Sequence, residues 1–159
     1  MNNGVPKAAV ELVRPMCATD LGAVSALDTL IQPSPWTQPQ LEQAWQQAYR
    51  GWVITQQQQL WGFALSQQVL DEVSLLSLGV HPAMRNRGYG HALLAAVIED
   101  ALQHHALSIY LEVRASHRQA QHLYQRHGFK AMAQRKAYYR NPEEDAIIMH
   151  LLLAQPTPQ

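Results

Sequence analysis

The hydrophobic period of the chain changes at His81-Pro82, and this change limits which folds the chain can adopt. Before it lie three segments of strand character joined by short connections: 52–56, 60–70 and 72–80. They indicate an antiparallel meander. After it, apolar residues recur at helical spacing from about 90 to 105, and a short apolar strand follows at 108–113. A helix between two strands predicts a right-handed parallel crossover joined to the antiparallel part of the sheet.

Alternation, N-cap residues and helix breakers predict the other elements. In the N-terminal third they are a strand at 8–14 ended by Pro15, a helix capped by Thr19-Asp20 and running toward Ile31, and a helix opened by a Thr37/Gln40 capping box and running to about Tyr49. In the C-terminal third they are a helix capped by Ser116 and stopped by Gly128, and strands at 129–134 and 145–153. The predicted order, β-α-α-β-β-β-α-β-α-β-β, is a mixed α/β (α+β) fold with a central sheet of six to seven strands and about four helices.

The composition fits one domain, 1–159, with a core at about 8–153 and short flexible tails. Hydrophobic residues make up 47% and charged residues 15%, which argues against intrinsic disorder. Twelve basic and twelve acidic side chains cancel, so no broad attraction to nucleic acid or anionic lipid is expected. No apolar run approaches the roughly 20 residues that span a bilayer. We therefore expect a cytoplasmic protein, with no direct nucleic-acid partner, no membrane partner and a monomer favoured.

Cysteine and histidine usage predicts neither a disulfide nor a metal site. Cys17 is the single cysteine, and no motif sets a histidine and an acid beside it, so we expect a small buried side chain and not an acyl-accepting nucleophile. The chain has eight histidines. Those in the last predicted helix are spaced by five, whereas a helical metal site uses the i, i+4 spacing. We predict no metal.

The segment Arg85-Asn86-Arg87-Gly88-Tyr89-Gly90 lies between a predicted strand and a predicted helix. Glycines there let the backbone approach a ligand closely, and unpaired N–H groups at a helix start favour an anion. The third glycine of a dinucleotide-binding fold and the Gly-Lys-Ser/Thr of a P-loop are both missing. The segment is a candidate anion site, with an ordinary turn that contains two glycines as the alternative.

Several motifs in a common order resemble the GNAT superfamily of N-acetyltransferases. They are Leu78-Gly79-Val80-His81-Pro82, Arg85-x-x-Gly88-x-Gly90, Leu111-Glu112-Val113-Arg114-Ala115-Ser116, Leu123-Tyr124 and Gly128-Phe129. With further matches such as Pro35-Trp36, the resemblance covers about 10–152 and is greatest to the RimI branch, which acetylates the N-terminal alanine of a small-subunit ribosomal protein. It implies the GNAT fold, acetyl-CoA as co-substrate and the N-terminal segment of a ribosomal protein as acceptor.

The same resemblance implies where CoA would bind. Its pyrophosphate would sit on the backbone amides of 86–91, and its pantetheine arm would pair with the strand edge at 78–80. The expected cofactor-binding residues are Leu78, Gly79, Val80, Arg85, Asn86, Arg87, Gly88, Tyr89, Gly90, His91 and His117. His117 is a departure, because the family usually has an asparagine there that contacts the cofactor, and a histidine differs in reach and charge state.

Two catalytic roles follow from the resemblance. Glu112 would accept the proton of the amine, and its alternative is an ion pair with Arg114, which shares its strand face. Tyr124 would act as the donor to the leaving thiolate, and its alternative is core packing beside Leu123. Proton transfer from a tyrosine with a pKa near 10 to a thiolate with a pKa near 8.5 is uphill by roughly 2 kcal/mol, so much of the benefit would be a hydrogen bond.

The resemblance also implies an acceptor groove lined by three aromatic residues: Trp36, Tyr138 and Tyr139. The acidic run 143–145 would favour a basic peptide, although loop aromatics often only pack and acidic runs are usually solvated. Two other functions stay open at this point. One is acetylation of a small amine such as a polyamine, an amino acid or an aminoglycoside, and the other is CoA binding without catalysis.

Overall fold

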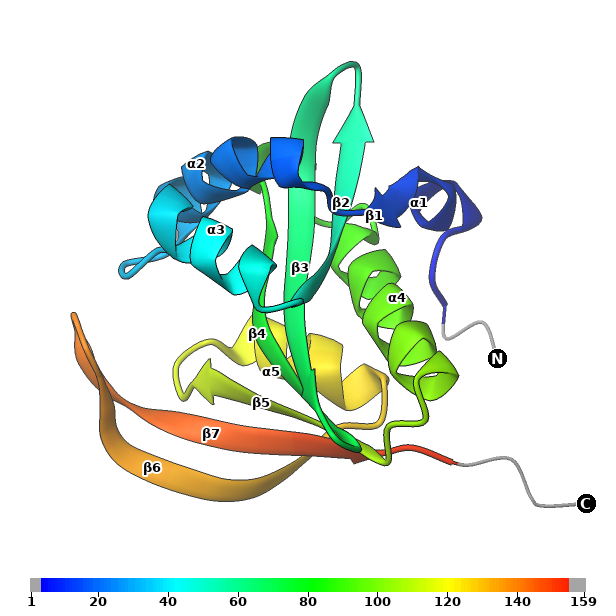
Figure 1. The fold of residues 1–159 in the computed structure, drawn as a ribbon. Coiled ribbons are helices and arrows are strands. Elements are labelled where there is room, and N and C mark those ends of the chain that lie inside the picture. Colours follow the sequence, from blue (N-terminus) through cyan, green and yellow to red (C-terminus); the bar gives the residue numbers. More distant parts are fainter. Residues whose placement is uncertain (1–3, 155–159) are drawn as a thin grey trace, which may run out of the picture.

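The computed structural model describes residues 4–154 as a seven-stranded sheet with helices on both faces (Figure 1). In chain order the elements are α1 (Lys7–Leu12), β1 (Val13–Pro15), η1 (Ala18–Asp20), α2 (Leu21–Ile31), α3 (Gln38–Gln46), β2 (Arg50–Gln56), β3 (Gln59–Val69), β4 (Glu72–Val80), η2 (Pro82–Met84), α4 (Tyr89–Gln103), β5 (Ser108–Arg114), α5 (Arg118–Arg126), β6 (Lys130–Arg140) and β7 (Glu143–Leu152). No helix within 4–154 is both long and apolar enough to cross a membrane.

The mixed sheet predicted from the sequence is confirmed. Its strand order is β1-β2-β3-β4-β5-β7-β6, and every neighbouring pair is antiparallel except β4 and β5, which the α4 crossover joins in parallel. The predicted meander corresponds to β2, β3 and β4. The five α-helices are one more than the sequence predicts.

Two hydrophobic cores form on the two faces of the sheet because successive strand residues point to opposite sides. Val53 and Phe63 pack with α2 and α3, whereas their neighbours Ile54 and Ala64 pack with α4 and α5. All four side chains are fully buried. The sheet therefore fixes α2 on one side of β4 and α4 on the other.

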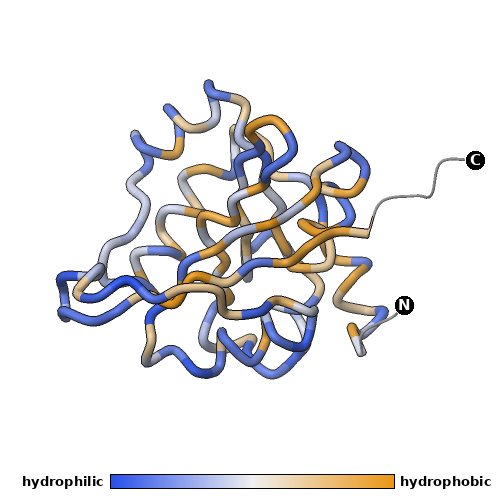
Figure 2. The backbone as a smooth tube through the Cα atoms, turned by 90° about the horizontal axis from the view of Figure 1, so that it is seen from below, coloured by the Kyte–Doolittle hydropathy of each residue, from blue (hydrophilic) through white to orange (hydrophobic). Residues whose placement is uncertain are grey.

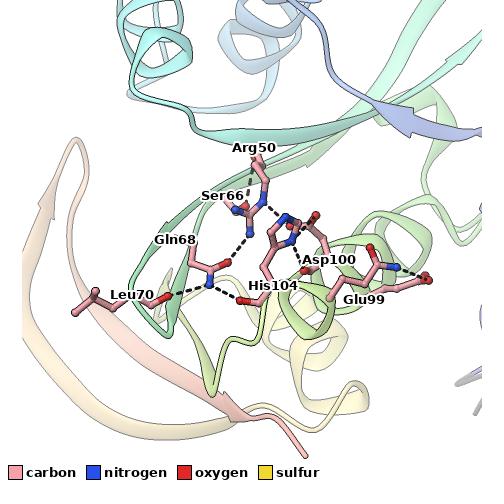
Figure 3. Close-up of polar contacts among 8 residues, drawn as sticks. Arg50, Ser66, Gln68, Leu70, Glu99, Asp100 and His104 are labelled. Atoms are coloured by element: carbon pink, nitrogen blue, oxygen red, sulfur yellow. Dashed lines mark hydrogen bonds and ion pairs between the residues drawn. The ribbon is translucent and has the colours of Figure 1, made fainter. Parts of the chain in front are cut away.

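The C-terminal end of α4 is tied to the sheet by a polar network (Figure 3). Arg50 on β2 donates to Asp100 and to Gln68 at 2.6 Å each. The amide nitrogen of Gln68 in turn donates to the carbonyls of Leu70 and His104. Because this end of α4 is held, the position of its other end is also set.

The prediction of a strand at 8–14 is wrong for most of its length. The helix α1 occupies Lys7–Leu12, and only Val13–Pro15 joins the sheet. Val5 and Ala9, four residues apart, are both buried in the core that contains α4. Within α1, Ala9 and Leu12 are three residues apart and both pack on this core, so the segment follows a helical period where it packs on α4.

Capping predictions are confirmed at one helix and wrong at two. Thr37 and Gln40 form the predicted capping box at α3, although this helix ends at Gln46. At α2, Asp20 makes no side-chain cap and instead accepts from Cys17 N–H, and Cys17 itself is exposed and not buried as predicted. At α5, Ser116 donates to Glu144, and the helix begins two residues later. In both cases a charged side chain outside the helix binds the expected capping residue: Arg14 binds Asp20, and Glu144 binds Ser116.

Strands β6 and β7 form a long hairpin whose tip projects from the body of the protein (Figure 1). The sequence predicts a shorter pair, 129–134 and 145–153, because the residues between them are polar. Figure 2 shows this projecting end as largely hydrophilic. Cross-strand pairing extends to Arg140 and Glu143, so backbone hydrogen bonds hold the tip where apolar burial does not.

An ion pair joins Arg14 on β1 to Asp20, the last residue of η1, directly before α2. Nη1 and Nη2 of Arg14 each donate to Asp20 at 2.8 Å, and these bonds, with the Cys17 N–H, lower the pKa of Asp20 from 3.8 to about 2. A pKa below its unfolded value adds stability above pH 4 that disappears as the pH falls toward 2.

We expect Asp20→Asn to lower the free energy of unfolding by about 1–2 kcal/mol at pH 6, since Arg14 is partly exposed and the ion pair is screened. The difference between the variant and the wild type should shrink from pH 4 to pH 2 in urea titrations. Asp71→Asn, at the β3–β4 turn, is the control and should leave the pH dependence unchanged. An equal loss at pH 2 and pH 6 would contradict the assignment.

Candidate active site

The parallel strands β4 and β5 part at one end of their pairing (Figure 1). A cleft lies at this point. The two strands pair only from Glu72 with Ser108 to Leu75 with Leu111, and beyond this β4 pairs with β3 alone and β5 with β7 alone. The register skips Leu76, and this bulge bends β4 at the point where it leaves β5. The resulting cleft has a volume of about 670 Å³, which is in the range of small-molecule sites.

Most residues that the sequence predicts for the site line this one cleft. They are Trp36, Leu78, Gly79, Val80, Arg85, Asn86, Gly88, Tyr89, Gly90, His91, Glu112, His117, Tyr124 and Tyr139. Two predicted residues, Arg87 and Tyr138, are exposed and are not among the lining residues of the described chain. Segments separated by a hundred residues in sequence are therefore brought to one space.

The loop before α4 presents backbone N–H groups to the cleft. Asn86 and Gly88 have left-handed φ angles of 64° and 81°, and Gly88 is the N-cap of α4. The first bond within the helix runs from Ala92 N–H to the Gly88 carbonyl, so helix geometry gives the N–H groups of 88–91 no acceptor inside α4. Such a cluster at the N-terminus of a helix favours an anion.

Gly88 also lies against the N-terminal segment. A Cβ atom built there would lie 2.5 Å from the ring of Pro6, which packs over the loop. A left-handed φ and a close neighbour together require glycine at this position. The packing of α1 on α4 thus supports the loop that carries the N–H groups.

One edge of β4 faces the cleft with its backbone unpaired to β5. Leu78, Gly79 and Val80 pair with β3 on the other side. An open strand edge offers N–H and C=O groups to an extended ligand. This edge lies in the same cleft as the N–H cluster, which suits a ligand with an anionic end and an extended arm.

Glu112 projects from β5 beyond the last residue that pairs with β4. Its side chain is 35% exposed, and the nearest cation is Arg135, whose guanidinium lies 3.9 Å from the carboxylate. The alternative ion pair with Arg114 is absent from the ion pairs of 4–154. Arg114 instead contacts Glu144 at 3.2 Å and the Pro142 carbonyl at 3.1 Å. The carboxylate of Glu112 therefore faces Arg135 and not Arg114, and it lines the cleft.

Tyr124 lies on α5 at the wall of the cleft and is buried beside Phe129. Burial, followed by the proximity of Tyr139, raises the pKa of its phenol well above 10. The group therefore stays protonated across the neutral range and can only donate its proton in a hydrogen bond or accept one as a neutral oxygen.

The hairpin places Tyr139 in the wall of the cleft and Tyr138 outside it. Tyr139 lines it beneath the Arg114 guanidinium, 4.2 Å from the ring centroid, and burial raises its pKa to about 12. Tyr138 stacks edge-on against Tyr139 at 5.1 Å, and a hydrogen bond with Glu112 is the main cause that raises its pKa. Tyr138 thus contacts the candidate base from outside the cleft.

The two histidines expected at the cofactor differ in their surroundings. Burial, followed by Arg126, lowers the pKa of His91, whose Nδ1 lies 3.0 Å from Nε2 of His127. Burial, followed by the charge of Arg85, lowers the pKa of His117, and the charge of Glu144 partly offsets this shift. Both histidines favour the neutral form, so any positive charge at this end of the cleft comes mainly from arginine.

The structure adds contacts among Arg114, Ser116 and Glu144, and one lining residue, Asp28, that the sequence patterns did not identify. Arg114 and Glu144 join β5 to the hairpin tip, and Ser116 completes this contact with two hydrogen bonds to Glu144. The expectation that 143–145 attract a basic peptide is weakened, because Glu144 and Asp145 have partners within the protein. Asp28 also lines the cleft, and its place on the apolar face of α2 is the signal that could have identified it.

No group of three or more His, Cys, Asp or Glu side chains within 4–154 is arranged to hold a metal ion. The groups at the cleft include the N–H donors at the start of α4, the carboxylates of Asp28 and Glu112, and the phenols of Tyr124 and Tyr139. Such groups bind anions, accept a proton and stabilise a developing negative charge.

Comparisons with known proteins agree with this geometry. The sequence profile of the acetyltransferase (GNAT) family matches residues 23–129. The ribosomal protein bS18-alanine N-acetyltransferase of Escherichia coli K12 is 34% identical over 135 residues, 84% of this chain and 91% of that protein. The enzyme of the same name from Haemophilus ducreyi is 37% identical over 122 residues, which cover 75% of this chain and 84% of that protein. The crystal structure of the ribosomal-protein-S18-alanine N-acetyltransferase from Escherichia coli superposes with a TM-score of 0.84 and 31% identity, covering 91% of this chain and 95% of that one.

We expect Gly88→Ala to lower the free energy of unfolding by about 1–2 kcal/mol and to weaken binding of acetyl-CoA measured by calorimetry. The added Cβ meets Pro6 and disfavours the left-handed φ that aims the N–H groups. Gly22→Ala in α2 is the matched control, because its Cβ would meet only the flexible Gln38 side chain at 3.4 Å. Equal effects of the two substitutions would contradict the proposed importance of the Gly88 conformation.

Proposed function

The chain belongs to the acetyltransferase (GNAT) family, and on that premise we propose that it transfers the acetyl group of acetyl-CoA directly to the N-terminal alanine α-amine of a ribosomal protein. One observation carries the proposal: a single cleft holds a helix N-terminus with free N–H groups, an open strand edge and a carboxylate. The relatives named for bS18-alanine acetylation support the choice of acceptor. A ribosomal protein as acceptor also favours a cytoplasmic location.

The proposed binding mode of acetyl-CoA follows from the shape of the cleft. The pyrophosphate binds the N–H groups at the start of α4, with Arg85 adding positive charge. The pantetheine arm pairs with the β4 edge at 78–80, and one of these N–H groups polarises the thioester carbonyl. His117, in place of an asparagine, lines the same end and can donate one hydrogen bond.

The proposed reaction needs one proton acceptor and one donor. An α-amine has a pKa of roughly 7.7–8.0, so Glu112 has to accept only one proton, directly or through a water, before the amine attacks the thioester carbon. The carbon–sulfur bond of the tetrahedral adduct then breaks, the nitrogen gives its excess proton to the departing thiolate or to water, and CoA leaves with the acetyl group on the amine as an amide. Because burial raises the pKa of Tyr124, its phenol stabilises the thiolate by a hydrogen bond and does not give up its proton fully.

The proposed acceptor groove lies between Trp36 and the hairpin tip. Trp36, in the connection after α2, and Tyr139, on β6, both line the cleft. Tyr138 makes a hydrogen bond with Glu112. Trp36 is held by α2, and Tyr139 by Arg114. An extended peptide with a free α-amine fits between such walls, with its amine directed to Glu112.

The substrate is tested with a short synthetic peptide that carries the N-terminus of bS18 and begins with alanine. We expect mass spectrometry to detect one acetyl group on its α-amine after incubation with acetyl-CoA and enzyme. A panel of polyamines, amino acids and aminoglycosides is assayed in parallel. Turnover of a small amine with no acetyl mass on the peptide would overturn the proposed acceptor and leave the family unchanged.

The role of Glu112 is tested by Glu112→Gln, which keeps the shape of the side chain but removes the base. We expect kcat to fall about 100-fold and the acidic limb of the pH–rate profile to disappear, with acetyl-CoA affinity unchanged. Glu143→Gln at the exposed hairpin tip is the control and should keep the wild-type profile. An unchanged profile for Glu112→Gln would remove this residue from the mechanism.

A further inference from the structure

Asp28 is a buried carboxylate at the wall of the cleft that the proposed mechanism does not use. It lies on α2 with 1% of its surface exposed, on the helix face that also buries Leu21 and Val24. Acidic side chains are almost never fully buried unless they are paired. Its presence on an apolar face therefore needs an explanation.

Part of the explanation is a contact with Trp36. The N–H group of Trp36 donates to Oδ2 of Asp28 at 2.7 Å, and Oγ of Ser25 donates to the Trp36 carbonyl at 2.9 Å. Ser25 and Asp28 are three residues apart, so they share one face of the helix. Together they hold both backbone groups of Trp36 and fix this residue at the wall of the cleft.

This contact does not account for the second oxygen. Oδ1 of Asp28 is buried and has no hydrogen-bond partner within the described residues. No charged side chain contributes to the pKa of Asp28, which burial raises and the Trp36 N–H partly restores. A neutral residue could accept the Trp36 N–H equally well without the cost of an unpaired buried carboxylate.

We propose that Asp28 is a specificity-determining residue, which fixes Trp36 as a wall of the acceptor groove and presents a buried negative charge to the protonated amine that enters it. The inference rests on the proposed acetylation of an amine, and it does not depend on which amine is acetylated. In this proposal two carboxylates have different roles. Asp28 attracts the ammonium form of the acceptor, and Glu112 then accepts its proton.

The electrostatics favour this division. Near pH 7 most α-amines are protonated, so the acceptor arrives as a cation. A charge in a low-dielectric wall acts over several ångströms more strongly than one in water, and direct contact is not required. Glu112, which is one-third exposed and faces Arg135, is screened by comparison. A cation in the groove also favours the ionised form of Asp28.

The test compares two peptides that differ only in the charged amine. One is the alanine peptide, and the other carries a propionyl group in place of alanine and therefore has no ammonium. For Asp28→Asn we expect the KM of the alanine peptide to rise at least about tenfold, while the Ki of the propionyl peptide changes less than about twofold. Acetyl-CoA affinity should stay the same. Equal changes for the two peptides, or no change for either, would overturn the proposal.

Two further variants distinguish the effect of the Asp28 charge from the effect of the hydrogen bonds that hold Trp36. Ser25→Ala removes the other half of the contact without changing a charge, so it should affect both peptides equally. Asp28→Glu keeps the charge and should retain the preference for the ammonium peptide. Loss of that preference in Asp28→Glu, or its selective loss in Ser25→Ala, would contradict the role of charge.

Folding and function are checked separately. Because burial raises the pKa of Asp28, ionisation above this pKa costs stability, and Asp28→Asn should be at least as stable as the wild type at pH 8 in thermal denaturation. If the wild type acetylates a small amine and not the peptide, the proposed acceptor fails, and the same comparison is made with that amine and its uncharged analogue. A wild type that acetylates no amine would overturn both proposals.

Discussion

The separation of β4 from β5 is the constraint on which the rest of the site depends. Inside a sheet each strand normally satisfies its backbone groups with both neighbours, so an open edge at the centre is unfavourable unless a ligand occupies it. Here the bulge at Leu76 turns β4 away after Leu75, while β5 continues alongside β7. The gap presents the main chain of one strand and the side chains of the other to the same space. A ligand can therefore bind at a point where a continuous sheet would leave neither an open space nor unpaired backbone groups.

Contacts from outside the sheet hold this gap in its shape. Arg50 and Asp100 fix one end of α4, and the packing of Pro6 on Gly88 supports the other. Arg114, held between Glu144 and the Tyr139 ring, keeps the hairpin tip over the cleft. None of these groups needs to touch a substrate. Their effect is to keep the donors and acceptors of the cleft in place before a ligand arrives, which reduces the ordering that binding requires.

The carboxylates of the chain illustrate how surroundings decide a role. Asp20 is paired with Arg14, which lowers its pKa and makes it part of the fold. Glu144 has a lowered pKa through Ser116 and Arg114 and fastens the hairpin. Asp28 is buried without a cation, and Glu112 is partly exposed with a cation only at 3.9 Å. These two carboxylates, which have no cation closer than 3.9 Å, line the cleft, where a ligand can supply a positive charge.

Local sequence was sufficient for the elements whose signals lie within one segment. The Thr37/Gln40 capping box, the three strands of the meander, the α4 helix and the glycine loop before it were all predicted, because neighbouring residues determine turns, caps and periodicity. The candidate site residues came from the order of motifs, and most of them meet in one cleft. Where local signals had a distant competitor, prediction failed: the segment 8–14 packs on α4 as a helix, and Ser116 bonds Glu144 instead of capping α5.

The sequence by itself thus determined the types of the main elements and the chemistry that the chain carries. Only the tertiary structure decided which carboxylate pairs with Arg114, because this arginine contacts Glu144, 30 residues away in sequence, and not Glu112, two residues away. It also decided that Asp28 would be buried beside Trp36. Such choices depend on distances through space, and the pattern of residues along a chain does not contain them.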